Sequence, residues 1–141
     1  MNYMNDEVWF VDTNVLVYLF DVDAPAKKAI AEHVFREQAN IRLSTQVLQE
    51  FYVTVTRKLG RPLPPEYALQ AVKHFQTYPV ATISSALVTR SIQRSMEAQL
   101  SLLDSLIVET ALAEQADRLV TEDLQDGWTL GTMRIWNPFK V

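Results

Sequence analysis

The chain lacks cysteine and is poor in glycine, and both absences exclude classes of protein. With no cysteine in 141 residues, disulfide bonds, thiolate metal sites and cysteine nucleophiles are excluded, which fits a reducing compartment. Only three glycines and six prolines leave little room for linkers or low-complexity segments. Hydrophobic residues make up 48% of the chain, so we expect one domain over residues 1–141.

Long apolar runs and an excess of basic residues are also missing. No apolar run approaches the ~20 residues that a helix needs to cross a bilayer. The first residues, MNYMNDEVWF, lack the basic start and apolar stretch of a signal peptide. We therefore expect a cytoplasmic protein with no membrane partner. The net charge of −4 argues against a broad nucleic-acid-binding surface, because phosphate contacts come from Lys and Arg.

Short apolar segments alternate with helical patterns along the chain. We predict strands at Glu7–Val11, Ile41–Leu43, Tyr78–Ile83, Arg118–Thr121 and Met133–Trp136. The third should lie at an edge of the sheet because it contains Pro79. The alternation predicts an α/β fold, with a five-stranded parallel sheet flanked by helices on both faces. Ligands of such folds gather at the carboxyl ends of the strands.

Four acids lie where that rule directs attention. Asp12 directly follows the first strand, and Asp123 follows the fourth by two residues. Glu50 is in the second turn of the helix after the second strand, and Asp104 is in the first turn of a later helix. If the topology is right, all four reach one edge of the sheet. Carboxylates that share a pocket raise each other's pKa unless a cation neutralises them.

An oxygen-only set of ligands favours magnesium or manganese over zinc. Such a site suits phosphodiester hydrolysis, because a bound metal lowers the pKa of a water molecule. Each acid also has a structural explanation. Asp12 could cap the next helix, Glu50 could be solvated, Asp104 could form a capping box with Ser101, and Asp123 could belong to an acidic turn. Taken one by one, none of the four is specific.

The sequences around these acids carry more information. The segments VDTNVLVYLFD, STQVLQEFY, SLLDSLIVETAL and LVTEDLQDG contain Asp12, Glu50, Asp104 and Asp123 in turn. In this order they resemble the four motifs of PIN-domain ribonucleases, and in particular those of VapC toxins from type II toxin–antitoxin systems. The resemblance covers the chain from near residue 8 to its end, and TEDLQDG is its most specific stretch. It implies a PIN-like three-layer fold.

The resemblance also implies roles for individual residues. The metal-binding and catalytic acids would be Asp12, Glu50, Asp104 and Asp123, with Mg²⁺ or Mn²⁺ as cofactor, and Asp126 would be a fifth acid, in direct or water-mediated contact with the metal. Thr13 and Asn14 would hydrogen-bond the acids, and Ser44 has a weaker claim to do so. Glu122 would either support the site from behind or be solvated. The implied reaction is cleavage of RNA by metal-activated water.

One departure from the family pattern concerns the residue before Asp104. Many relatives have an aromatic residue there, whereas this chain has Leu102 and Leu103. Leucine can replace the aromatic ring in packing but not in stacking on a base. His33 and His74 stand among apolar and charged residues, and we interpret both as structural or surface residues.

Partners follow from the same resemblance. It implies a homodimer and a cognate antitoxin whose C-terminal segment covers the active site. An apolar groove for that segment could involve Val17, Tyr18 and Phe20, although these residues could equally belong to the core. Candidate RNA-contacting cations are Arg57, Lys58 and Arg61, whereas we interpret Arg90 and Arg94 as surface residues.

Three rival functions fit less well. A haloacid-dehalogenase phosphatase needs a second Asp where this chain has Asn14. A receiver domain needs an Asp after its middle strand, where this chain has Ser84 and Ser85. A catalytically weak PIN-like module that binds RNA or protein is the remaining alternative, and it would have no reason to retain all four acids.

Overall fold

The computed structural model describes residues 6–37 and 40–140 and contains a mostly parallel β-sheet. In this part of the chain six strands are ordered β3-β2-β1-β4-β6-β5 across the sheet. Every neighbouring pair is parallel except β5 and β6, which are antiparallel. The strands are β1 Trp9–Val11, β2 Ile41–Ser44, β3 Val80–Ala81, β4 Arg118–Val120, β5 Thr129–Leu130 and β6 Met133–Trp136.

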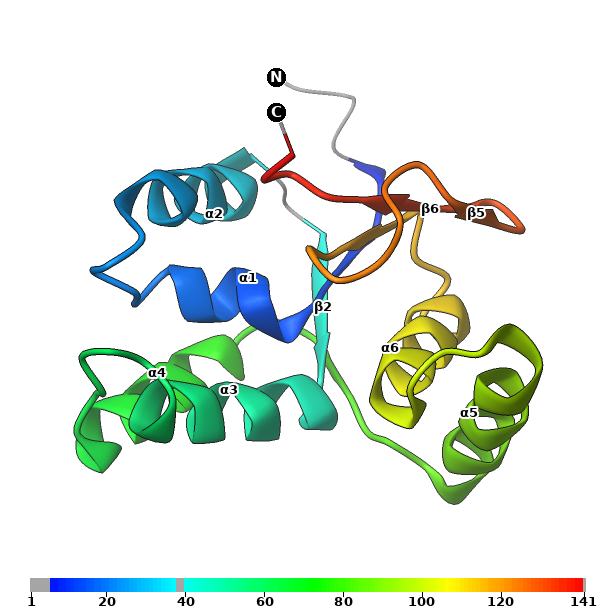
Figure 1. Ribbon diagram of the computed structural model, residues 1–141, viewed down its shortest axis with the longest axis horizontal. Coiled ribbons are helices and arrows are strands. Elements are labelled where there is room, and N and C mark those ends of the chain that lie inside the picture. Colours follow the sequence, from blue (N-terminus) through cyan, green and yellow to red (C-terminus); the bar gives the residue numbers. More distant parts are fainter. Residues whose placement is uncertain (1–5, 38–39, 141) are drawn as a thin grey trace.

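Helices cover both sides of this sheet. In Figure 1 α1 to α4 lie on one side of the strands, and α5 and α6 lie on the other. None of the helices in the described ranges is long and apolar enough to cross a membrane. The helices are α1 Thr13–Tyr18, α2 Pro25–Glu37, α3 Thr45–Arg57, α4 Pro65–Phe75, α5 Ser85–Ala98 and α6 Leu102–Ala113.

Burial on both faces explains why the strands are apolar without alternation. Phe10 and Val11 of β1 are both fully buried, and so are Leu119 and Val120 of β4. Consecutive residues of a strand point to opposite faces, so both faces of these two strands must be covered. The core therefore lies on both sides of the central strands β1 and β4.

The predicted fold class is confirmed, with one difference in the number of strands. The five predicted strands all occur, and the segment after Pro79 lies at the edge as expected. The prediction of five strands is one short, because Thr129–Leu130 forms a further edge strand with β6. The two strands are joined by a turn in which Gly131 has a φ of 61°, a backbone conformation that favours glycine.

The strand order places a crevice between β1 and β4. From β1 the chain adds β2 and β3 on one side, and β4, β6 and β5 lie on the other. Strand order reverses at this point, and open α/β sheets bind ligands there, outside the carboxyl ends of the strands. Because β2, β1 and β4 are adjacent and parallel, their carboxyl ends meet at one edge.

Candidate active site

The four acids predicted from the sequence line one pocket at this edge of the sheet. The pocket has a volume of about 490 Å³, a size typical of small-molecule sites. Its lining includes Asp12, Glu50, Asp104 and Asp123, which come from four separate segments of the chain. The other lining residues are Thr13, Asn14, Gln49, Val53, Thr54, Lys58, Ser101, Leu103 and Ile107.

Asp12 is the buried acid of this pocket, with 5% of its surface exposed. It is the N-cap of α1, where its Oδ1 accepts a 2.6 Å hydrogen bond from the Thr13 backbone N–H. Its Oδ2 accepts one of 2.8 Å from the hydroxyl of Thr121. Burial raises the pKa of Asp12 to about 7, an effect that these two hydrogen bonds oppose and that the charges of Asp123 and Glu50 reinforce. The helix cap and the pocket acid are thus the same side chain.

Glu50 is held by two neutral donors on the face of α3 that meets the pocket. The Thr13 hydroxyl donates to Oε1 at 2.8 Å. The side-chain amide of Gln46 donates to Oε2 at 3.3 Å and to the carbonyl of Leu103 at 3.2 Å. Gln46 therefore connects Glu50 to the first turn of α6, which also carries Asp104. The sequence analysis missed Gln46, although its position four residues before Glu50 puts both on one helix face.

Asp104 combines a place in the pocket with a place in a helix cap. Its backbone N–H donates to Ser101 Oγ at 3.0 Å, so Ser101 caps α6 as the sequence suggested. The carboxylate is left free by this bond, because only the backbone of Asp104 takes part in it. The half-buried side chain of Asp104 lines the pocket.

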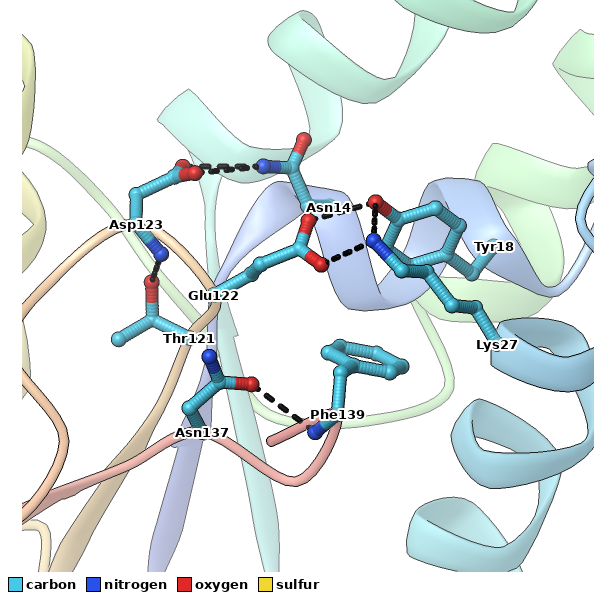
Figure 2. Close-up of polar contacts among 8 residues, drawn as sticks. All are labelled: Asn14, Tyr18, Lys27, Thr121, Glu122, Asp123, Asn137 and Phe139. Atoms are coloured by element: carbon cyan, nitrogen blue, oxygen red, sulfur yellow. Dashed lines mark hydrogen bonds and ion pairs between the residues drawn. The ribbon is translucent and has the colours of Figure 1, made fainter. Parts of the chain in front are cut away.

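Asp123 is the exposed acid, and it lies in the loop that follows β4. The amide of Asn14 donates to both of its oxygens, at 3.1 and 2.9 Å (Figure 2). Its backbone N–H donates to Thr121 Oγ1 at 3.0 Å, so this hydroxyl contacts both Asp12 and Asp123. Partial burial raises the pKa of Asp123, and the charges of Asp104, Glu122 and Glu50 add to the effect.

The sequence analysis also missed Thr121. We assigned it to the end of the fourth strand, and the structure places it one residue beyond β4. Its side chain is fully buried between the two acids that it contacts. The available signal was the position itself, because the residues just after a parallel strand face the ligand-binding edge.

Two predicted acids and one hydroxyl lie elsewhere. Asp126 is the one predicted ligand that is not in the pocket lining, because its Oδ1 accepts a 2.9 Å hydrogen bond from the Asn137 N–H. Ser44 is buried and caps α3 by accepting from the Val47 N–H. Glu122 is outside the pocket lining and is not simply solvated, because its carboxylate accepts hydrogen bonds from Tyr18 and Lys27.

The residues suggested for an antitoxin groove are engaged inside the domain. Val17 is buried, and Phe20 packs edge-on against Phe51 and Phe75. The hydroxyl of Tyr18 donates a hydrogen bond to Glu122 and accepts one from Lys27. This placement favours the alternative that these residues belong to the core.

The candidate cations differ in their surroundings. Among the residues that the structure describes, Lys58 is the only Lys or Arg in the pocket lining. Arg61 lies 3.5 Å from Asp23 in an ion pair, and Arg57 is exposed outside the pocket. Arg90 and Arg94 both pair with Glu109 and so connect α5 to α6, outside the pocket lining. Both histidines, His33 and His74, are exposed and outside the pocket.

The four carboxylates line the pocket, but they do not converge on one point within it. Within residues 6–37 and 40–140, no three Asp, Glu or His side chains form a ready-made metal-binding group. Neutral donors from Thr13, Gln46 and Asn14 hold the carboxylates of Glu50 and Asp123 at the wall. The donor set is made of oxygen atoms, and burial raises the pKa values of Asp12 and Asp123, with smaller contributions from the neighbouring carboxylates.

A comparison with protein families matches the PIN domain family to residues 9–125. The chain belongs to the PIN domain family. A comparison of its sequence with curated proteins gave no match. The family assignment therefore rests on the match over residues 9–125.

Several solved structures have the same fold as this PIN domain. One is a toxin–antitoxin complex from Klebsiella pneumoniae, with a TM-score of 0.71 and 20% identity over 94% of this chain and 98% of that one. Another is VapC20 of Mycobacterium tuberculosis, a sarcin-ricin loop cleaving toxin, with a TM-score of 0.63 and 17% identity over 79% and 86% of the two chains. A third is VapBC2 of Rickettsia felis bound to promoter DNA, with a TM-score of 0.61 and 19% identity over 92% and 99%.

Proposed function

We propose that this PIN-domain protein is a metal-dependent endoribonuclease and the toxin of a toxin–antitoxin pair. Its reaction would be hydrolysis of RNA phosphodiester bonds by activated water. The observation that carries the proposal is the convergence of Asp12, Glu50, Asp104 and Asp123 on one pocket. Membership of the PIN family supports a nuclease, and structural neighbours that are toxins support the biological role.

The donor set fits a hard divalent cation. Asp12, Glu50, Asp104 and Asp123 would hold Mg²⁺ or Mn²⁺, because these ions take carboxylate oxygens and water as ligands. When bound, the cation would lower the pKa of a water molecule and offset the charge of the scissile phosphate. The raised pKa of Asp12 fits this role, since a buried acid without a counter-charge keeps its proton to higher pH.

The remaining pocket residues would orient these acids and the substrate. Asn14 fixes the direction of Asp123 through two hydrogen bonds, and Thr13 fixes Glu50 through one. Lys58 stands at the same pocket and would attract an RNA phosphate. One basic side chain at the pocket also agrees with the negative net charge of the chain, since the contact surface for RNA would be small.

A protein partner is supported by an apolar groove between α3 and α4. Tyr52, Val53 and Leu69 line it and are exposed despite being large and apolar. Contiguous exposed apolar side chains often mark protein–protein contacts. We propose an antitoxin and a second copy of the chain as partners. Size-exclusion chromatography with light scattering would test the dimer.

RNA cleavage by the purified protein tests the proposed activity. We expect wild type to cut single-stranded RNA with Mg²⁺ or Mn²⁺ and to lose activity in a chelator. Asp12→Asn should be inactive, whereas Asp126→Asn should cut like wild type because Asp126 is outside the pocket. RNA binding by wild type without cleavage would favour the non-catalytic alternative. Activity of Asp12→Asn equal to that of wild type would overturn the proposal.

A further inference from the structure

A second polar cluster lies directly behind Asp123 and is not part of the pocket. Glu122 accepts a 2.5 Å hydrogen bond from the Tyr18 hydroxyl and another of 2.5 Å from Lys27 Nζ. Lys27 Nζ also donates to the Tyr18 hydroxyl at 3.1 Å. Tyr18, Lys27 and Glu122 form a cluster that we name the Glu122 brace. Figure 2 shows the brace on one side of the loop after β4, with Asp123 turned toward Asn14.

The brace connects segments that are far apart in the sequence. Tyr18 ends α1, Lys27 is in the first turn of α2, and Glu122 lies in the loop after β4. The contacts of Glu122 span 104 and 95 residues of chain. Phe139 completes the cluster, because its ring packs edge-on against Tyr18 with centroids 4.9 Å apart. Lys27 Nζ lies 4.9 Å from the centroid of the Tyr18 ring. The loop is thereby attached to two helices.

The contacts of the Glu122 brace contribute little to the free energy of folding. The side chain of Lys27 is 43% exposed and that of Glu122 is 22% exposed. An ion pair with this exposure contributes about 1 kcal/mol or less. The charge of Glu122 also lies beside the acids of the pocket, where a negative charge is unfavourable. A role in positioning explains better than a role in stability why an acid stands here.

Position matters because Glu122 and Asp123 are consecutive. Their side chains leave the loop in different directions, Glu122 toward Tyr18 and Lys27 and Asp123 toward Asn14 of the pocket lining (Figure 2). Fixing Glu122 on one side therefore fixes the backbone from which Asp123 projects. Asp123 is exposed, and among residues 6–37 and 40–140 its own hydrogen bonds are to Asn14 and Thr121. A displacement of about 1 Å in a catalytic group can reduce the rate by about 100-fold.

We propose that Tyr18 and Lys27 act through Glu122 as positioning residues for Asp123. They hold the loop after β4 so that the carboxylate of Asp123 faces the pocket before any substrate or metal arrives. This inference rests on the proposed function for its catalytic consequence but not for its structural one.

Hydrogen exchange of the metal-free protein tests the structural part. Tyr18→Phe removes one hydroxyl while keeping the ring against Phe139, and Lys27→Ala removes the cation. We expect both variants to exchange amide protons in residues 121–126 faster than wild type by up to about 5-fold, because local opening then costs less. Lys28→Ala is the matched control, since Lys28 contacts Leu19 and Glu32 and not the loop. Exchange in this loop equal to that of wild type in both variants would overturn the proposal.

Titration with Mn²⁺ and RNA cleavage test the consequence. We expect Tyr18→Phe and Lys27→Ala to bind Mn²⁺ more weakly and to lower kcat by about 10-fold with little change in KM, as for other residues that orient metal ligands. Lys27→Arg should restore both values toward those of wild type. Glu122→Ala should resemble Tyr18→Phe. If removing the charge of Glu122 instead improved Mn²⁺ binding or kcat, electrostatic repulsion would dominate and the proposal would fail.

The experiments distinguish an error in the role of the Glu122 brace from an error in the proposed function. If wild type cuts RNA and Asp12→Asn does not, but all brace variants match wild type in exchange and kcat, only the brace is wrong. If wild type cuts no RNA, loop exchange and Mn²⁺ binding still decide the role of the brace.

Discussion

The side-chain amide of Asn14 donates to both carboxylate oxygens of Asp123, at 3.1 and 2.9 Å, across 109 residues of chain. Asn14 lies in the first turn of α1, two residues after Asp12. The end of β1 therefore supplies one acid of the pocket and the hydrogen-bond donor for another. This pairing joins the two sides of the crevice between β1 and β4.

Loss of this amide should reduce activity more than stability. We expect Asn14→Ala to lower cleavage activity by about 10- to 100-fold, because residues that orient metal ligands have effects of this size. Asn137→Ala is a control, since the amide of Asn137 accepts from the Phe139 N–H and contacts none of the four acids. It should lower the melting temperature while leaving the cleavage rate close to that of wild type. A cleavage rate for Asn14→Ala equal to that of wild type would show that the amide is dispensable.

The pKa of Asp12 predicts how stability depends on pH without metal. Burial raises this pKa from 3.8 to about 7, so the folded protein keeps a proton that the unfolded chain has released. The associated stability is fully present below about pH 4 and is lost as the pH rises through about 7. Asp123, whose pKa is also raised, contributes in the same direction.

Melting curves of the metal-free protein test this dependence. We expect wild type to melt at a lower temperature at pH 7.5 than at pH 5.5, where Asp12 is mostly protonated. Asp12→Asn removes the ionising group, so its melting temperature should fall less over that range, and at pH 7.5 it should exceed that of wild type. The free-energy difference should be on the order of a few kcal/mol, since one pKa unit corresponds to about 1.4 kcal/mol. An identical pH dependence in both proteins would contradict the assignment.

Lys58 should contribute to RNA binding rather than to the chemical step. It is the cation of the pocket lining, whereas its neighbour Arg57 is exposed outside that lining. We expect Lys58→Ala to raise KM. The slope of log affinity against log salt concentration should become less steep, by the amount that corresponds to the loss of about one phosphate contact. Arg57→Ala should change either quantity less. Equal effects of the two substitutions would point to a diffuse charge effect.

The sequence predicted the features that depend on local order along the chain. Asp12 follows a buried strand and starts a helix, and both properties are visible in a few neighbouring residues. Ser101 and Asp104 show the spacing of a helix cap, which the structure has. Strand β5 could not be predicted, because its two residues are extended only through pairing with β6.

The roles of the remaining residues depend on contacts between distant segments of the chain. Glu122 looked like either a support for the site or a solvated acid, because Tyr18 and Lys27 reach it only in the folded chain. Asp126 lies three residues after Asp123, and nothing local distinguishes the two acids. The chain turns after Asp123 and brings Asp126 to the backbone of Asn137 instead of the pocket. Gln46 shows no such signal locally, because its contact with Leu103 exists only once α6 packs beside α3.

Mn²⁺ binding to the purified protein without RNA tests most directly whether the four acids form a metal site. Titration followed by electron paramagnetic resonance would compare wild type with Asp12→Asn, Glu50→Gln, Asp104→Asn and Asp123→Asn. Asp126→Asn is the matched control, because its side chain keeps an oxygen for the Asn137 N–H. We expect each of the four substitutions to weaken binding by about 10-fold or more and the control to bind like wild type. Binding that survives all four substitutions, or that is lost only in Asp126→Asn, would contradict a metal site in this pocket.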